Sequence, residues 1–313
     1  MSLPALVGVL ALVSAQDAQS LVDGAFEFGH PAVGTLLVNQ PGHARGDWGN
    51  FCSAFLIHER VLLTAGHCVQ QAAAQLSAGV FLDARISLQQ NPFDPRTYVE
   101  GDPDASGWLE IEELVNNPDN PDWLNIPEIE ANWGTWHDQG AIVLSKPVKH
   151  TKPLRVPWVP GSVELLTTIQ CEWLANVPGF CEPLLVAYGL QSFPPAFVPN
   201  QRQSRETNYD SIDPLFIHTR ADPGDACFGD SGGAVIMKRG RNGRELVVAL
   251  QSSPLAPFSP TNLPCTGGSL QYRLDTKSSI RFMWDVILDA VWAQEHQHTR
   301  FKMSWRMWHK STF

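Results

Sequence analysis

Positive charge is scarce in this sequence. Its 313 residues include 22 Lys and Arg against 32 Asp and Glu, which gives a formal net charge of −10 at pH 7. This charge argues against a polyanionic partner such as nucleic acid, and cationic or neutral substrates remain open. Only 17% of the residues are charged and 43% are hydrophobic. This balance excludes a disordered chain and fits a globular protein with room for two packed cores.

The sequence also has no apolar run long enough to cross a bilayer. The run at residues 3–15 has the length of a signal-peptide core, and it ends in a small-residue cleavage pattern at Val13-Ser14-Ala15. No Lys or Arg precedes it, so either the true start lies upstream or the free amino group is the positive end. We expect residues 1–20 to be a signal peptide and short propeptide, and the protein to be secreted to an extracellular or periplasmic location.

Closely spaced cysteines are missing as well. None of the six cysteines forms a pair with the short spacing of a structural zinc knuckle, which argues against a zinc site. An even number of cysteines fits disulfides in an oxidising compartment, although the sequence alone leaves their pairing open.

Short apolar runs, separated by 24 Gly and 24 Pro, dominate the chain. They are rich in Val, Leu and Ile and predict strands of an all-β barrel or sandwich. The clearest are residues 32–38, 55–65, 140–144, 184–188, 234–237 and 245–251. One helix is expected near the end, where Ile280, Trp284, Ile287, Leu288 and Val291 recur at helical spacing after the capping residues 275–279. This spacing predicts that Trp284 and Trp292 belong to the core.

The first candidate catalytic residue is Ser231, in the turn Gly229-Asp230-Ser231-Gly232-Gly233. Glycines on both sides of Ser231 permit unusual backbone conformations and a close approach of a substrate carbonyl, although such turns are also common as plain connectors. A serine needs a neighbouring base, and the base needs a third group to orient it. His67, in Ala65-Gly66-His67-Cys68, and Asp138, at the start of an apolar strand, offer those roles.

The three motifs, in the order His, Asp, Ser, resemble those of the trypsin-like, chymotrypsin-fold serine proteases from about Leu21 to about Val291. The matching patterns are Ala-Gly-His-Cys, Asp-x-x-x-aliphatic-x-Leu and Cys-x-Gly-Asp-Ser-Gly-Gly. The resemblance implies two antiparallel six-stranded β-barrels with a C-terminal α-helix, in a protease domain at residues 21–295 whose barrels meet near residues 154–163. It implies a secreted serine endopeptidase in which His67, Asp138 and Ser231 are catalytic and no cofactor or metal is needed.

The resemblance assigns further roles. The N–H groups of Gly229 and Ser231 would form the oxyanion hole, and a new amino terminus at Leu21 would pair with Asp230 when a zymogen is activated. Asp225 would lie at the floor of the substrate pocket and select Arg or Lys, with Ser252 and Ser253 along the pocket; alternatively Asp225 is an exposed loop acid. The implied disulfides are Cys52–Cys68 and Cys227–Cys265, which leaves Cys171 with Cys181.

Two segments exceed what the family needs. Residues 92–133 hold eleven acids and one basic residue, Arg96, and are expected to form a solvated surface insertion, with calcium binding as an alternative. Residues 296–313 form a basic, aromatic tail that has no acid. The tail could contact a membrane, dock on a partner, fold back on the acidic body or remain disordered.

Two other functions stay open. A secreted homologue that binds a partner without cleaving it would keep the fold, but such proteins usually lose a triad residue. An esterase could use the same acyl chemistry. The expected partners are a peptide or protein substrate and, as for other proteases, a protein inhibitor.

Overall fold

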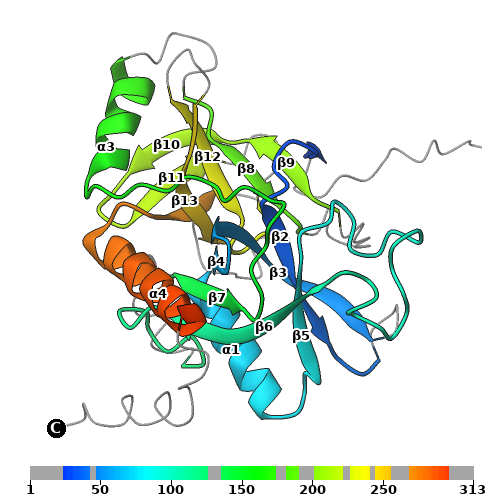
Figure 1. Ribbon diagram of the computed structural model, residues 1–313. Helices are drawn as coiled ribbons and strands as arrows, with labels where there is room; N and C mark the ends of the chain where they lie inside the picture. Colours follow the sequence, from blue (N-terminus) through cyan, green and yellow to red (C-terminus); the bar gives the residue numbers. More distant parts are fainter. Residues whose placement is uncertain are drawn as a thin grey trace, which may run out of the picture.

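The computed structural model describes residues 24–42, 47–125, 135–173, 181–189, 201–220, 226–239, 244–254 and 268–295. Two antiparallel sheets make up most of the molecule, and short helices lie against them (Figure 1). The first sheet is a closed barrel in the order β2-β3-β4-β7-β6-β5, and the second has eight strands in the order β1-β9-β8-β12-β13-β14-β11-β10.

The barrel strands are β2 (Val33–Asn39), β3 (Trp48–His58), β4 (Val61–Thr64), β5 (Asp83–Ser87), β6 (Leu109–Asn116) and β7 (Gly140–Leu144). Their interior is apolar: Val33, Phe55, Leu63, Ile86 and Ile142 are fully buried. Each such side chain stabilises the fold by about 1.5–3 kcal/mol through its removal from water. The first predicted barrel is confirmed.

The second sheet contains β1 (Ala25–Phe26), β8 (Leu184–Ala187), β9 (Gln203–Glu206), β10 (Asn208–Ile212), β11 (Phe216–Arg220), β12 (Ala234–Arg239), β13 (Arg244–Pro254) and β14 (Ser269–Arg273). It differs from the predicted second barrel of six strands. Because β1 pairs with β9 and β10 pairs only with β11 among the described residues, the outer strands do not meet to close the sheet there.

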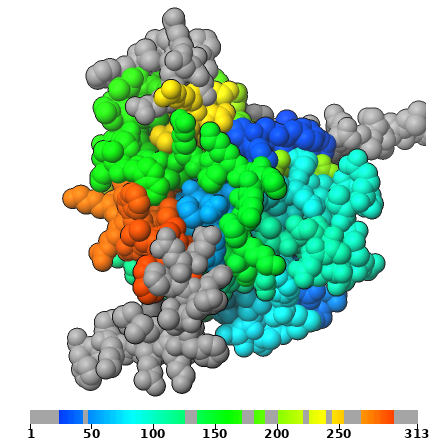
Figure 2. Space-filling view, viewed as in Figure 1, coloured from blue at the N-terminus to red at the C-terminus, as the bar shows by residue number. Residues whose placement is uncertain are grey.

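The connection from β7 to the second sheet bonds to both halves of the molecule. The N–H of Leu154 donates to the carbonyl of Leu56 in the barrel, and the carbonyl of Arg155 accepts from Val247 in the second sheet. Figure 2 shows this green segment running over the surface beside α4. The barrel boundary near residues 154–163 stays a prediction, and it falls on this connection.

The helices are α1 (Gly66–Ser77), α3 (Ser162–Thr167), the π-helix η1 (Thr168–Trp173) and α4 (Lys277–Glu295). The predicted C-terminal helix is therefore present. Its core face differs from the expected one: Phe282, Met283 and Val286 are buried, whereas Trp284 and Trp292 are 47% and 62% exposed. The prediction that both tryptophans are core residues was wrong, because α4 packs on the barrel through the neighbouring face. Trp284 instead packs against Trp158, with ring centroids 4.8 Å apart.

The acidic segment is only partly a surface insertion. Residues 109–116 form β6, a strand of the barrel, and the side chain of Glu112 pairs there with Arg60. Among the described residues no helix is long and apolar enough to span a bilayer.

Candidate active site

His67 lies in the first turn of α1, which begins directly after β4. A Cβ at Gly66 would lie 1.9 Å from the side-chain nitrogen of Asn120 and 3.0 Å from the backbone nitrogen of Gln139, so a larger residue would have to displace the Asn120 side chain. The disulfide Cys52–Cys68 joins β3 to the same turn. The position of His67 is thereby fixed to the barrel on two sides.

Asp138 ends the segment before β7 and is completely buried. Its Oδ2 lies 2.9 Å from Nδ1 of His67, and its Oδ1 accepts a hydrogen bond of 2.9 Å from the backbone N–H of the same residue. The carboxylate therefore orients both the ring and the backbone of the histidine.

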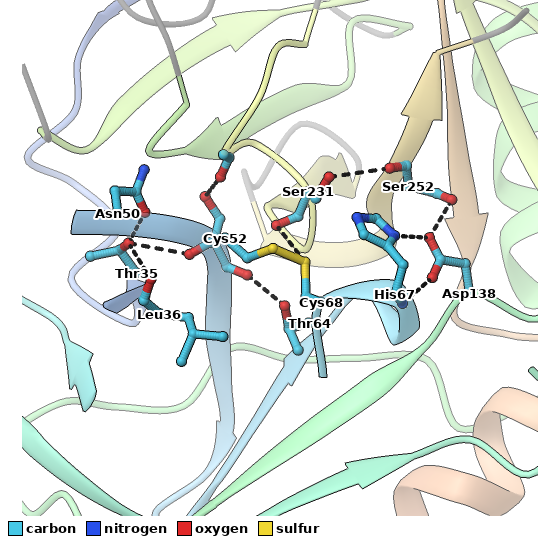
Figure 3. Close-up of a disulfide and its surroundings, with 12 residues drawn as sticks. Thr35, Leu36, Asn50, Cys52, Thr64, His67, Cys68, Asp138, Ser231 and Ser252 are labelled. Carbon is cyan, nitrogen blue, oxygen red and sulfur yellow. Dashed lines mark hydrogen bonds and ion pairs between the residues drawn. A yellow bond between two sulfur atoms is a disulfide. The ribbon is translucent and has the colours of Figure 1, made fainter. Parts of the chain in front are cut away.

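Ser252, on β13, completes the surroundings of that carboxylate. Its hydroxyl donates to Oδ2 of Asp138 at 2.6 Å (Figure 3). Burial opposes ionisation of Asp138, but His67 and the hydrogen bonds from His67 and Ser252 outweigh it, so the pKa of Asp138 is held below its ordinary value. The acid is a stable carboxylate.

The serine turn is held by the barrel. Ser53, on β3, donates from its N–H to the carbonyl of Ser231 and from its hydroxyl to the carbonyl of Gly229, both at 2.8 Å. Gly229 and Gly232 have φ angles of 92° and 81°, a region that favours glycine. A Cβ at Gly232 would also lie 2.2 Å from the carbonyl oxygen of Ser53. The two glycines therefore have conformational and steric reasons to be glycine.

The hydroxyl of Ser231 donates to the carbonyl of Ser252 over 3.4 Å, a long hydrogen bond. Within the described ranges no hydrogen bond joins this hydroxyl to His67, but Figure 3 shows the two side chains beside each other. In the same part of the chain, the N–H groups of Gly229 and Ser231 have no acceptor. Both amides are thus available to an added oxygen.

Asp230 is buried beneath the serine turn. Its Oδ1 accepts from the N–H of Gly189 at 2.6 Å, and its Oδ2 from the N–H of Cys227 at 2.7 Å. Leu21, its predicted partner, lies outside the described residues. The carboxylate is at the place where it can govern the conformation of the turn.

The predicted pocket residues are only partly visible. Asp225 lies outside the described residues, and Ser252 and Ser253 are buried, with 2% and 8% exposure. The hydroxyl of Ser252 faces Asp138, a role that the sequence did not indicate. The substrate-binding assignments of all three residues stay predictions.

Trp123 is a site residue that sequence reasoning missed. Its ring lies against the imidazole of His67, with centroids 5.1 Å apart. Asn120 accepts a hydrogen bond from its indole N–H, and Gln70 of α1 accepts one from its backbone N–H, both at 2.8 Å. The acidic segment therefore contributes an apolar wall to the histidine, and the only available signal was an aromatic residue in a polar stretch.

The disulfides agree with the expected pairing where it can be seen. Cys52–Cys68 and Cys171–Cys181 are present, and Cys227 is disulfide-bonded, whereas Cys265 lies outside the described residues. Cys52, His67 and Cys68 place potential metal ligands within 4.8 Å of one another, but both sulfur atoms are used in the disulfide. In the described chain, no carboxylate group of the acidic segment forms part of such a cluster.

One comparison with known proteins matches part of the chain to a protein family. A family model described as Trypsin matches residues 29–131, which include His67 and end before Asp138 and Ser231. A comparison with curated proteins finds no match. The matched segment forms most of the closed barrel, and the mostly β architecture agrees with the chymotrypsin fold. The family match and the architecture together support a trypsin-like serine protease family for this chain.

Proposed function

We propose that this protein is a secreted serine endopeptidase that cleaves peptide bonds through an acyl-enzyme at Ser231. The observation that carries the proposal is the double contact of Ser252, whose carbonyl accepts from Ser231 while its hydroxyl donates to Asp138. One residue thus joins the candidate nucleophile to the acid that orients His67. The small-residue pattern before residue 16 and the disulfides support secretion.

The contact between His67 and Asp138 decides which ring nitrogen of His67 carries the proton. Because Nδ1 of His67 faces the ionised carboxylate of Asp138, Nδ1 carries the ring proton and Nε2 keeps its lone pair. In the proposed reaction Nε2 accepts the proton of Ser231 while Oγ bonds to the carbonyl carbon of the substrate. The imidazolium, stabilised by Asp138, then gives the proton to the leaving amine, and water releases the acyl group by the same route.

The oxyanion would be held by the two amides of the serine turn, Gly229 and Ser231. One such donor is worth about 2.7–4 kcal/mol in another serine protease. Since the hydroxyl of Ser231 makes only a long hydrogen bond, to the carbonyl of Ser252, a rotation about its side-chain bond can redirect it to His67 when substrate binds.

Two single substitutions test the function. Ser231→Ala and His67→Ala should each lower hydrolysis of a peptide library by several orders of magnitude with unchanged folding, because the groups act as one unit. Either variant retaining more than a few per cent of wild-type activity would contradict the triad. A folded, processed wild type that binds peptides without cleaving them would favour the non-catalytic alternative.

We further propose that the protein is made as a zymogen. Residues 21–24, Leu-Val-Asp-Gly, resemble the start of mature relatives, and the buried Asp230 is suited to receive a new amino group. Binding of that amine would fix the turn that carries Gly229 and Ser231. N-terminal sequencing of the active protein is the test, and full activity with residues 16–20 attached would refute this scheme.

Specificity for Arg or Lys is proposed from Asp225. Counting from Cys227 places this acid at the pocket floor, where a carboxylate is costly unless a cation meets it. On matched peptides, kcat/KM should favour Arg over Phe or Ala by at least about tenfold, or about 1.4 kcal/mol, and Asp225→Ser should remove that lead. A wild-type preference for Phe or Ala would reject this assignment and leave the triad unaffected.

A further inference from the structure

A groove lies away from the candidate active site, between α4 and the end of β6. Its cavity volume is about 440 Å³. The floor is apolar and includes Val115, Val143, Phe282 and Val286. Figure 1 shows α4 lying beside β6 and β7, and residues of all three elements line the groove.

The rim of the groove is acidic. Glu113, Asp119, Asp285 and Asp289 line it, against a single cation, Arg281. Arg281 and Asp285 form an exposed ion pair at 3.8 Å. Such a pair has a small interaction free energy, so it holds neither side chain firmly. Within the described residues Asp289 has no ionic partner. An occupant of this groove should therefore combine positive charge with apolar surface.

We propose that the groove receives the chain's own tail, residues 296–313. The tail contains Arg300, Lys302, Arg306 and Lys310 and no acid, and its aromatic residues are Phe301, Trp305, Trp308 and Phe313. Its cations match the acidic rim, and its aromatic side chains match the apolar floor. The remainder of the protein carries a net negative charge, which also attracts the positively charged tail.

The tail has the reach that this docking needs. The groove extends along α4 from Ala290 back to Ser278, and the tail begins where α4 ends, after Glu295. At about 1.5 Å per helical residue, Ser278 lies about 26 Å from that end. Eighteen residues extended at about 3.3 Å each span about 59 Å, which leaves enough chain for a reversal of direction.

The groove wall also connects to the active-site side of the barrel. Ser278 donates to Asp119 at 2.6 Å, and Asn117 donates from its backbone to the carbonyl of Gln139, the residue after Asp138. Three residues further along the chain, Asn120 holds the indole of Trp123 against His67. The docked tail would therefore cover a wall that is continuous with the support of the histidine.

Carbodiimide cross-linking of the full chain tests this docking directly. The reagent forms an amide between a lysine amine and a carboxylate only when the two are in contact. In the Ser231→Ala chain, which avoids self-cleavage, mass spectrometry should find Lys302 or Lys310 joined to Asp285, Asp289, Asp119 or Glu113. Salt near 1 M should lower the yield, because the Debye length falls to about 3 Å.

Matched variants make the result specific. Asp285→Asn with Asp289→Asn should lower the total yield of links between the tail and the groove at least fivefold. Asp102→Asn with Asp104→Asn removes the same charge from a loop that does not line the groove and should leave the yield unchanged. The proposal would be overturned if the links persist in the Asp285→Asn, Asp289→Asn protein. It would also be overturned if both double variants lose the links equally.

An equal mixture of ¹⁵N-labelled and unlabelled protein distinguishes the source of the tail. Links within one isotope support docking in the same chain, whereas mixed-isotope links would assign the groove to a second copy. No tail link at all, combined with sedimentation of the protein on phosphatidylserine vesicles, would assign the tail to a membrane. A protein that shows neither a tail link nor sedimentation on the vesicles would also overturn the proposed docking.

Discussion

The indole of Trp123 and the imidazole of His67 are in contact, with their centroids 5.1 Å apart and their planes inclined by 58°. Trp123 is itself buried and packs edge-on against Trp136, with centroids 4.9 Å apart. One face of the histidine is therefore shielded from water by an aromatic pair. This relationship gives the acidic segment a part in the chemistry that its composition does not suggest.

Trp123→Ala should lower kcat/KM for a peptide substrate by about tenfold, or about 1.4 kcal/mol. Without the indole, the imidazole of His67 loses its packing partner, and water reaches the hydrogen bond between His67 and Asp138. Trp123→Phe should keep most of the activity, because an aromatic ring remains. The adjacent Leu124→Ala, at a side chain that is 56% exposed, is the control and should have no effect. Equal activity in Trp123→Ala and wild type would show that the contact does not matter for catalysis.

Ser252→Ala should destabilise the protein by about 1–3 kcal/mol, since a buried carboxylate loses a hydrogen-bond donor. The pKa of Asp138 should rise, because the hydroxyl of Ser252 favours the charged form. Activity should fall with it. Urea unfolding and kcat/KM measure the two effects, and Ser211→Ala, at an exposed serine of β10, is the control. A Ser252→Ala protein as stable and active as the control would refute this role.

The stability that Asp138 provides should depend on pH. Its pKa is lowered in the folded protein, so its contribution is complete above the unfolded pKa near 3.8 and is lost as the pH falls through the lower folded value. The difference in free energy of unfolding between wild type and Asp138→Asn should therefore be constant near neutrality and shrink in strong acid. A difference that grows on acidification would contradict the ion pair with His67.

Gly232→Ala should prevent stable folding. The new Cβ would meet backbone atoms of Ser53 and Ala65 at 2.2 and 2.9 Å, in addition to the strain of φ at 81°. Gly79→Ala is the control, because φ is 70° there but nothing lies within 4 Å of the added atom. It should cost only about 1–2 kcal/mol. Similar melting temperatures for the two variants would show that the serine turn is not held as tightly as these contacts require.

Much of the fold follows from local pattern. The apolar runs predicted β7 at its observed bounds and placed β8, β12 and β13 within a few residues, because buried strands of Val, Leu and Ile have few alternatives. The acidic β6 was not predicted. Its outward positions are glutamates in a stretch dominated by charge, and only the pairing with β5 and β7 identifies it as a barrel strand.

The candidate site, like the fold, was predicted from the sequence only in part. His67, Asp138 and Ser231 were found because each lies in a short motif, and the structure brings the first two into direct contact. Trp123 and the hydroxyl of Ser252 were missed because their partners are far away in the sequence. The face of α4 was wrongly assigned, since Trp284, Leu288 and Trp292 also repeat at helical spacing but face outward. Periodicity indicates a helix, whereas the neighbouring elements decide which side is buried.

Catalysis by Ser231 is tested most directly by labelling the processed protein with a fluorophosphonate, followed by mass spectrometry of its peptides. The triad mechanism predicts one phosphonyl adduct, on Ser231, that forms in step with the loss of peptide hydrolysis and does not form in His67→Ala. A folded protein that hydrolyses peptides without an adduct on Ser231, or an adduct at another serine, would contradict it.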